Sequence, residues 1–103
     1  MNIIITSRKF KARDILKDFI TEEVKSLEKY NDRILSADVI LSYQNSRDSI
    51  KIAEIILQVP GQTLTATEES DEYKKAVSLA VDKLSRQLTK LKSKKTARIR
   101  AWT

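Results

Sequence analysis

The chain has 103 residues, of which 41% are hydrophobic and 33% are charged, and its formal net charge is +6. This length suits one domain that buries a hydrophobic core. Cysteine and histidine are both absent, which excludes disulfides, thiolate metal sites and histidine-based proton transfer. With a single glycine, the chain has no glycine-rich phosphate loop. We therefore expect a protein that is not an enzyme and holds no metal or other cofactor.

The N-terminal residues give no sign of export. The apolar run at residues 3–5 is much shorter than the core of a signal peptide, and charged residues follow it. No segment approaches the roughly 20 apolar residues that span a bilayer. We expect a cytoplasmic protein without a membrane partner.

The first predicted elements are a strand over residues 2–7 and a helix over residues 13–30. The strand is rich in β-branched residues. In the helix, apolar residues recur every three or four positions and share one face. This spacing predicts that the following residues face the core: Leu16, Phe19, Ile20, Val24, Leu27 and Tyr30.

Three strands are predicted next, over residues 35–44, 49–59 and 63–68. Apolar and polar residues alternate along them, as Ile55 and Leu57 do with Glu54 and Gln58. Such alternation is typical of a sheet that is covered on one face and open to solvent on the other. The dipeptide at residues 60–61, Pro-Gly, predicts a type II turn between the last two strands.

A second helix is predicted over residues 71–93, with Ser70 or Asp71 as its N-terminal cap. Its buried stripe comprises Tyr73, Val77, Ala80, Leu84, Leu88 and Leu91. The order β-α-β-β-β-α indicates an α+β fold in two layers, a four-stranded sheet with both helices packed on one face. We expect one domain over residues 1–95, followed by a basic tail over residues 96–103.

Positive charge is concentrated at the C-terminal end. Residues 1–70 carry ten basic and eleven acidic residues, whereas residues 71–103 carry ten basic and three acidic ones. On the last helix, Lys83, Arg86, Lys90 and Lys94 follow one another at three- and four-residue spacing and form one stripe. A one-sided row of cations next to an apolar stripe is typical of phosphate binding, although a solvated helix face would look similar.

Two segments resemble a known family. Residues 18–34 (DFITEEVKSLEKYNDRI) and residues 66–94 (ATEESDEYKKAVSLAVDKLSRQLTKLKSK) are similar to the bacterial ribosome hibernation-promoting factors. That family includes ribosome-associated inhibitor A, and its members were also called sigma-54 modulation proteins. The resemblance covers residues 1 to about 95 and implies the β-α-β-β-β-α fold.

The resemblance also implies a partner and a site. Family members bind the 30S subunit and the 70S ribosome near the subunit interface, in the channel for messenger and transfer RNA, and they inhibit translation under stress and in stationary phase. The chain resembles the short type of the family, and we expect a monomer off the ribosome. The implied contacts to 16S ribosomal RNA come from the last helix, its basic extension and the first helix: Lys83, Arg86, Lys90, Lys94, Lys95, Arg98, Lys25, Lys29 and Arg33.

Several alternatives stay open. A generic double-stranded-RNA-binding module shares part of the element order and would use Lys74 and Lys75, but its second contact loop normally has a histidine. A protein-interaction module is the other alternative. The resemblance does not decide whether the chain promotes or prevents ribosome pairing, and Trp102 could stack on a base or remain loose. The first helix also departs from the family, with Ala12 and Arg13 where a capping Ser or Thr is common.

Overall fold

The chain folds into a sheet and two helices in the predicted order. The computed structural model describes the backbone of residues 1–44 and 50–102 and the side chains of residues 1–44 and 50–91. This arrangement confirms the α+β fold expected from the sequence. The elements are β1 (Asn2–Ser7), α1 (Asp14–Lys25), a 3-10 turn η1 (Ser26–Lys29), β2 (Ser36–Gln44), β3 (Ile50–Val59), β4 (Gln62–Ser70) and α2 (Tyr73–Trp102).

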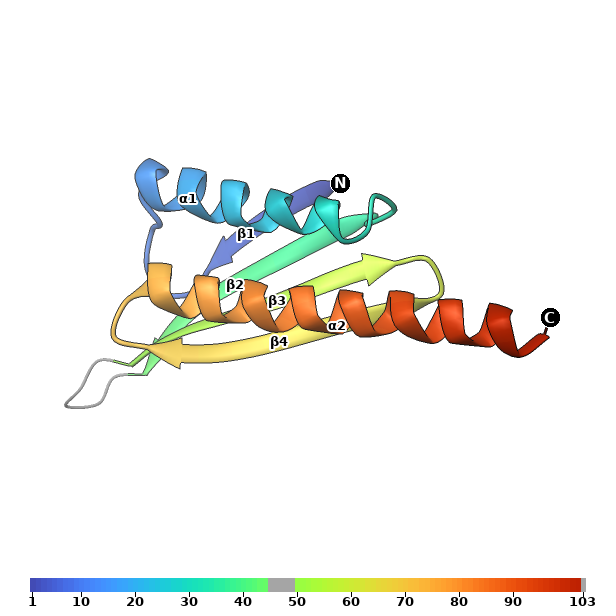
Figure 1. Cartoon of the computed structure of the whole chain (residues 1–103). Helices are drawn as coiled ribbons and strands as arrows, with labels where there is room; N and C mark the ends of the chain where they lie inside the picture. Colours follow the sequence, from blue (N-terminus) through green and yellow to red (C-terminus); the bar gives the residue numbers. More distant parts are fainter. Residues whose placement is uncertain (45–49, 103) are drawn as a thin grey trace.

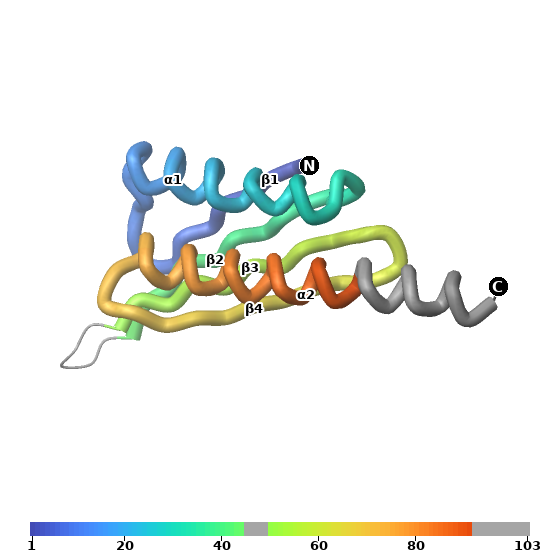
Figure 2. The backbone as a smooth tube through the Cα atoms, viewed as in Figure 1, coloured from blue at the N-terminus to red at the C-terminus, as the bar shows by residue number. Residues whose placement is uncertain are grey.

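The four strands form one mixed sheet in the order β1-β2-β3-β4. Strands β1 and β2 are parallel, with Asn2 opposite Ser36, because α1 carries the chain back to the same end of the sheet. The β2–β3 and β3–β4 pairs are antiparallel. Both helices lie across one face, α1 towards β1 and α2 over β3 and β4 (Figures 1 and 2). The two-layer arrangement predicted from the alternating strands is therefore confirmed.

The core lies between the helices and the inner face of the sheet. Strand residues alternate between buried and partly exposed positions, as the period of two requires. No polar or charged side chain is buried among the described residues. The largest fully buried side chains are Ile20, Leu27, Leu41, Ile55, Leu57, Leu84 and Leu88.

The first helix is shorter than predicted. Its N-cap is Arg13, which makes no side-chain capping hydrogen bond, as its departure from the family pattern suggested. The α-helix ends at Lys25, and η1 continues it to Lys29. In a 3-10 turn, side chains three residues apart lie above one another, so Tyr30 lies on the same side as Leu27. Tyr30 follows the last residue of η1, however, and so lies past the end of the turn. There it is 39% exposed, so its predicted place in the core is wrong.

An aromatic cluster fastens the start of α2 to the sheet. The Phe10 ring stacks on Tyr73 at 5.0 Å and meets the edge of Tyr43 at 6.1 Å. The Tyr73 hydroxyl donates a hydrogen bond to the carbonyl oxygen of Ser42 at 3.0 Å. These contacts tie the β1–α1 loop, β2 and α2 together.

The predicted bounds of α2 need correction at both ends. The helix begins at Tyr73 rather than residue 71, and the Glu72 carbonyl accepts the first helical hydrogen bond, from Ala76 at 3.1 Å. The Ser70 hydroxyl donates to the Asp71 carboxylate instead of capping the helix. The helix extends to Trp102, beyond the end predicted at residue 93. The boundary between domain and tail remains a prediction.

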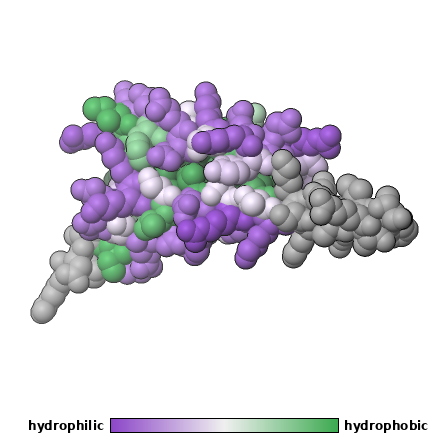
Figure 3. Space-filling model, viewed as in Figure 1, coloured by the Kyte–Doolittle hydropathy of each residue, from purple (hydrophilic) through white to green (hydrophobic). Residues whose placement is uncertain are grey.

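The β3–β4 turn has the backbone that the Pro-Gly pair predicts. Gly61 has a φ of 87°, a conformation that residues with a Cβ rarely adopt. The turn thereby leads β3 directly into β4. At the molecular surface, the helix side is mainly hydrophilic, with hydrophobic groups in the seam between α1 and α2 (Figure 3).

Candidate nucleic-acid interface

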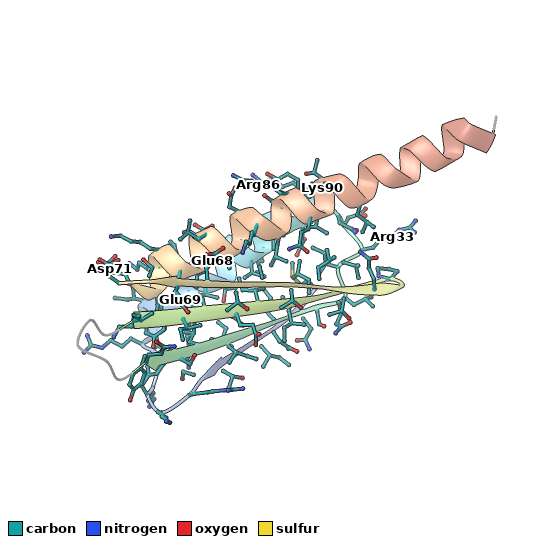
Figure 4. The ribbon with its side chains drawn as sticks, turned by 90° about the horizontal axis from the view of Figure 1, so that it is seen from below. Arg33, Glu68, Glu69, Asp71, Arg86 and Lys90 are labelled. Carbon is teal, nitrogen blue, oxygen red and sulfur yellow. The ribbon has the colours of Figure 1, made fainter. Side chains whose placement is uncertain are left out.

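The basic stripe of α2 begins on a firmly anchored part of the helix. Ala80, Leu84 and Leu88 are buried against the sheet, whereas Lys83, Arg86 and Lys90 are exposed. Figure 4 shows Arg86 and Lys90 on the side of α2 that faces away from the sheet. A rise of about 1.5 Å per residue places Lys83 and Lys90 roughly 10 Å apart along the helix. Because the core already holds the backbone beneath this row of cations, only their side chains would lose freedom on binding.

Two of these cations have acidic partners, which the spacing of the basic residues alone did not predict. The Lys83 ammonium lies 2.9 Å from a Glu68 carboxylate oxygen of β4. The Arg86 guanidinium lies 2.9 Å from the carboxylate of Asp82, one turn earlier. The Asp82 partner could have been found from its four-residue spacing to Arg86, whereas Glu68 could not, because only the folded chain brings β4 beside α2.

Neither ion pair closes the surface to a phosphate. The Arg86 side chain is 75% exposed and that of Lys83 is 55% exposed. Exposed ion pairs of this kind contribute only about 0–1 kcal/mol. A phosphate can therefore displace either carboxylate from its cation, or share the cation with it, at little cost. Among the described side chains, no carboxylate lies within ion-pair distance of Lys90.

The C-terminal candidates lie outside the described side chains. The backbone of α2 runs to Trp102 and includes Lys94, Lys95 and Arg98. Their proposed contacts with RNA, and the role of Trp102, remain predictions.

The candidates from the first helix lie where that helix ends. Lys25 is the last residue of α1 and Lys29 the last of η1, and both are exposed. Arg33 follows in the turn, where its backbone N–H donates to the Asn31 side-chain oxygen at 2.8 Å. Figure 4 places Arg33 at the end of the molecule where β3 turns into β4.

Three of the predicted cations line one groove. Lys29, Arg33 and Lys90 come from η1, the following turn and α2, and they border a groove of about 1020 Å³. Lys25 and Arg86 are not part of its lining. Sequence reasoning missed most of the other lining residues, because η1, the turn after it, the β3–β4 turn and α2 meet only in the folded chain. These others are Glu28, Tyr30, Asn31, Asp32, Val59, Pro60, Gly61, Gln62, Gln87, Leu88 and Leu91.

The opposite face of the molecule has the opposite charge. The positions of the four strands that face away from the helices include Asp38, Glu54 and Glu69, and none of these described positions holds Lys or Arg. Isoleucines and threonines fill most of the rest. The open sheet face is therefore acidic in a chain whose net charge is +6, and the candidate cations Arg86, Lys90 and Arg33 lie on the helix side or at the groove end.

The lysines that a duplex-RNA module would use are otherwise engaged. The Lys75 ammonium lies 3.3 Å from the Asp71 carboxylate. The hydrogen bond from Ser70, followed by the interaction with Lys75, lowers the pKa of Asp71 below its ordinary value. The Lys74 ammonium lies 5.6 Å from the centre of the Phe19 ring. Arg86 forms a comparable ion pair, so what distinguishes the stretch around Lys90 is that no described carboxylate lies within ion-pair distance of Lys90.

Two other classes of site lack support in the described residues. No group of three or more acidic side chains there could hold a metal ion. Among the helices that the structure describes, none is both long and apolar enough to cross a membrane.

Comparison with known proteins gives consistent results. A family model described as "Sigma 54 modulation protein / S30EA ribosomal protein" matches residues 3–96. A protein named ribosome hibernation promoting factor from Azotobacter vinelandii is 34% identical over 98 residues, covering 95% of this chain and 89% of the relative. A protein of the same name from Escherichia coli K12 is 32% identical over 94 residues, covering 91% of this chain and 96% of the relative.

Two solved structures share the fold. A ribosomal subunit interface protein from Coxiella burnetii superimposes with a TM-score of 0.82 at 27% identity, covering 90% of this chain and 99% of that one. The N-terminal domain of Protein Y from Thermus thermophilus superimposes with a TM-score of 0.79 at 29% identity, covering 88% of this chain and 99% of that domain. Since the family model spans nearly the whole chain, this protein belongs to the family of sigma 54 modulation proteins and S30EA ribosomal proteins.

Proposed function

We propose that this protein is a ribosome hibernation factor, which binds the small ribosomal subunit in the channel for messenger and transfer RNA near the subunit interface and inhibits translation. The observation that carries the proposal is the rigid row of exposed cations on α2, anchored beside Ala80, Leu84 and Leu88. The names of the similar proteins, ribosome hibernation promoting factor and ribosomal subunit interface protein, support the same function.

The distribution of charge supports one orientation on the subunit. Phosphates attract the helix side with Arg86 and Lys90 and repel the open sheet face with Asp38 and Glu54. We expect the helices to face 16S ribosomal RNA and the sheet to face away from it. A folded domain seated in this way inhibits translation by occupying the space that messenger and transfer RNA need, without any catalytic group.

The test is cosedimentation with purified 30S subunits. Arg86→Glu combined with Lys90→Glu should abolish association while leaving the circular dichroism spectrum and the melting temperature nearly unchanged. The matched control is Lys74→Glu with Lys75→Glu, which makes the same change in net charge at the other end of the described helix and should keep most of the binding. If the first double variant cosediments as well as the unaltered protein, the α2 site is wrong.

The duplex-RNA alternative makes the reverse prediction. A double-stranded-RNA module would lose binding with the Lys74 and Lys75 changes and would bind any short duplex tightly. Titration of a short RNA duplex into the protein, beside the 30S assay, separates the two functions. Tight binding to the duplex that depends on Lys74 and Lys75 would favour the alternative.

A further inference from the structure

The groove at the end of the molecule combines features that a row of cations alone does not have. Figure 1 shows the α1–β2 connection, the β3–β4 turn and the middle of α2 at the same end of the sheet. The groove between them is about 1020 Å³, which lies at the upper end of the range for small-molecule sites. It is therefore large enough to receive a planar aromatic ring together with the charged groups attached to it.

Tyr30 is the aromatic residue of this groove, and its backbone is fixed. Its N–H donates to the Leu27 carbonyl oxygen at 3.0 Å, which holds Tyr30 at the end of η1. Phe10, Tyr43 and Tyr73 pack on one another, whereas Tyr30 is 39% exposed and lines the groove. A large aromatic side chain that borders a groove on a firm backbone offers a face for another ring.

The groups around Tyr30 fit the other parts of a nucleotide. Lys29, Arg33 and Lys90 approach from three segments and can neutralise the phosphates on either side of a base. Among the apolar lining residues, Leu91 is partly exposed and can contact the base, whereas Val59 and Leu88 are 3% and 1% exposed.

Polar side chains at the rim can meet the edge of a base. The Gln87 amide is held in place, because its nitrogen donates to the Thr65 carbonyl oxygen at 3.2 Å. The carboxylates of Glu28 and Asp32 also border the groove. They would oppose a bare phosphate, but they can accept hydrogen bonds from the amino groups of a base.

We infer that the groove captures one unpaired RNA nucleotide, with its base stacked on Tyr30 and its neighbouring phosphates held by Lys29, Arg33 and Lys90. The nucleotide must be unpaired, because the bases of an A-form duplex are stacked and inaccessible to such a ring. On the ribosome this inference rests on the proposed function and adds a contact to one base beside the phosphate contacts of α2.

Two substitutions of Tyr30 test the stacking. Tyr30→Phe keeps the ring, and Tyr30→Leu keeps an apolar side chain without one. Stacking contributes about 1–3 kcal/mol per base, so Tyr30→Leu should weaken binding to 30S subunits by about 5- to 150-fold. Tyr30→Phe should bind like the unaltered protein. Melting curves of both variants check that the fold is intact.

Chemical probing of 16S ribosomal RNA gives the second readout. The unaltered protein and Tyr30→Phe should change the reactivity of one unpaired base that Tyr30→Leu leaves as in free subunits. Equal dissociation constants for Tyr30→Leu and the unaltered protein, with the same probing pattern, would overturn the inference and leave the proposed function intact.

A short single-stranded RNA separates this inference from the proposed function. A six-nucleotide RNA titrated into the full chain should shift the ring resonances of Tyr30 in nuclear magnetic resonance spectra, and Tyr30→Leu should bind it more weakly. If the unaltered protein fails to sediment with 30S subunits, the proposed function is wrong. The RNA titration alone then decides whether the groove binds a nucleotide. No binding at millimolar RNA, or equal affinity of Tyr30→Leu and the unaltered protein, would then overturn the nucleotide site.

Discussion

The Lys83 ammonium of α2 lies 2.9 Å from the Glu68 carboxylate of β4, so a strand residue partly neutralises the basic stripe of the helix. Glu68 is only 25% exposed and faces the helix layer, whereas its neighbour Glu69 faces the other side of the sheet (Figure 4). We therefore expect Glu68 to moderate the affinity of the proposed RNA-binding surface.

Removing this partner should strengthen RNA binding. Glu68→Gln releases Lys83 and removes a negative charge beside the stripe. The Lys83 side chain is 55% exposed, and a surface ion pair contributes about 0.2–1 kcal/mol, so affinity for 30S subunits at low salt should rise by up to about 5-fold. Glu69→Gln, the matched control, makes the same charge change on the other face and should have a smaller effect. A weaker complex with Glu68→Gln would mean that Glu68 itself contacts the ribosome.

The salt dependence of binding should reveal the contact at Lys90. If its ammonium neutralises one phosphate, Lys90→Gln should reduce the magnitude of the slope of log affinity against log salt concentration by about 0.7–0.9. Lys75→Gln, on the same helix, should leave that slope unchanged because Lys75 lies near the start of α2, away from the proposed RNA contacts around Lys90. The measurement is a series of equilibrium titrations with 30S subunits at several salt concentrations. Equal slopes for both variants would remove Lys90 from the interface.

Stability at alkaline pH should depend on Tyr73. Burial raises the pKa of its hydroxyl above the ordinary value, and nearby Tyr43 raises it further. The folded state therefore retains this proton when the unfolded chain has already lost it. The resulting stabilisation is complete below the unfolded pKa of about 10 and is lost as pH rises from there through the folded pKa.

Tyr73→Phe checks this dependence and the hydrogen bond to Ser42 together. Near neutral pH the variant should lose about 1 kcal/mol of unfolding free energy, because it lacks the 3.0 Å hydrogen bond to the Ser42 carbonyl. Above a pH of about 10 its stability should fall less steeply than that of the unaltered protein. Urea titrations across this pH range provide the measurement, and parallel curves would show that another group titrates.

Periodicity and turn chemistry were enough to predict the elements and the layers. The alternation in β3 and the three- to four-residue spacing in α2 place apolar side chains on one face each, and only a two-layer packing buries both faces. The Pro-Gly turn was predictable for the same local reason, since Gly61 tolerates its φ of 87°. The spacing of Lys83, Arg86 and Lys90 likewise determined that they share one side of the helix.

Other features depend on which segments meet in space, and only the tertiary structure decided these. The pairing of Lys83 with Glu68 needs β4 to lie beside α2, and the groove needs Lys29, Arg33 and Lys90 to converge from three segments. Tyr30 was assigned to the core because a 3.6-residue period was extended past Lys25, where the helix tightens. Local sequence determines the direction of a side chain within its own element, but the neighbours it meets are set by long-range packing.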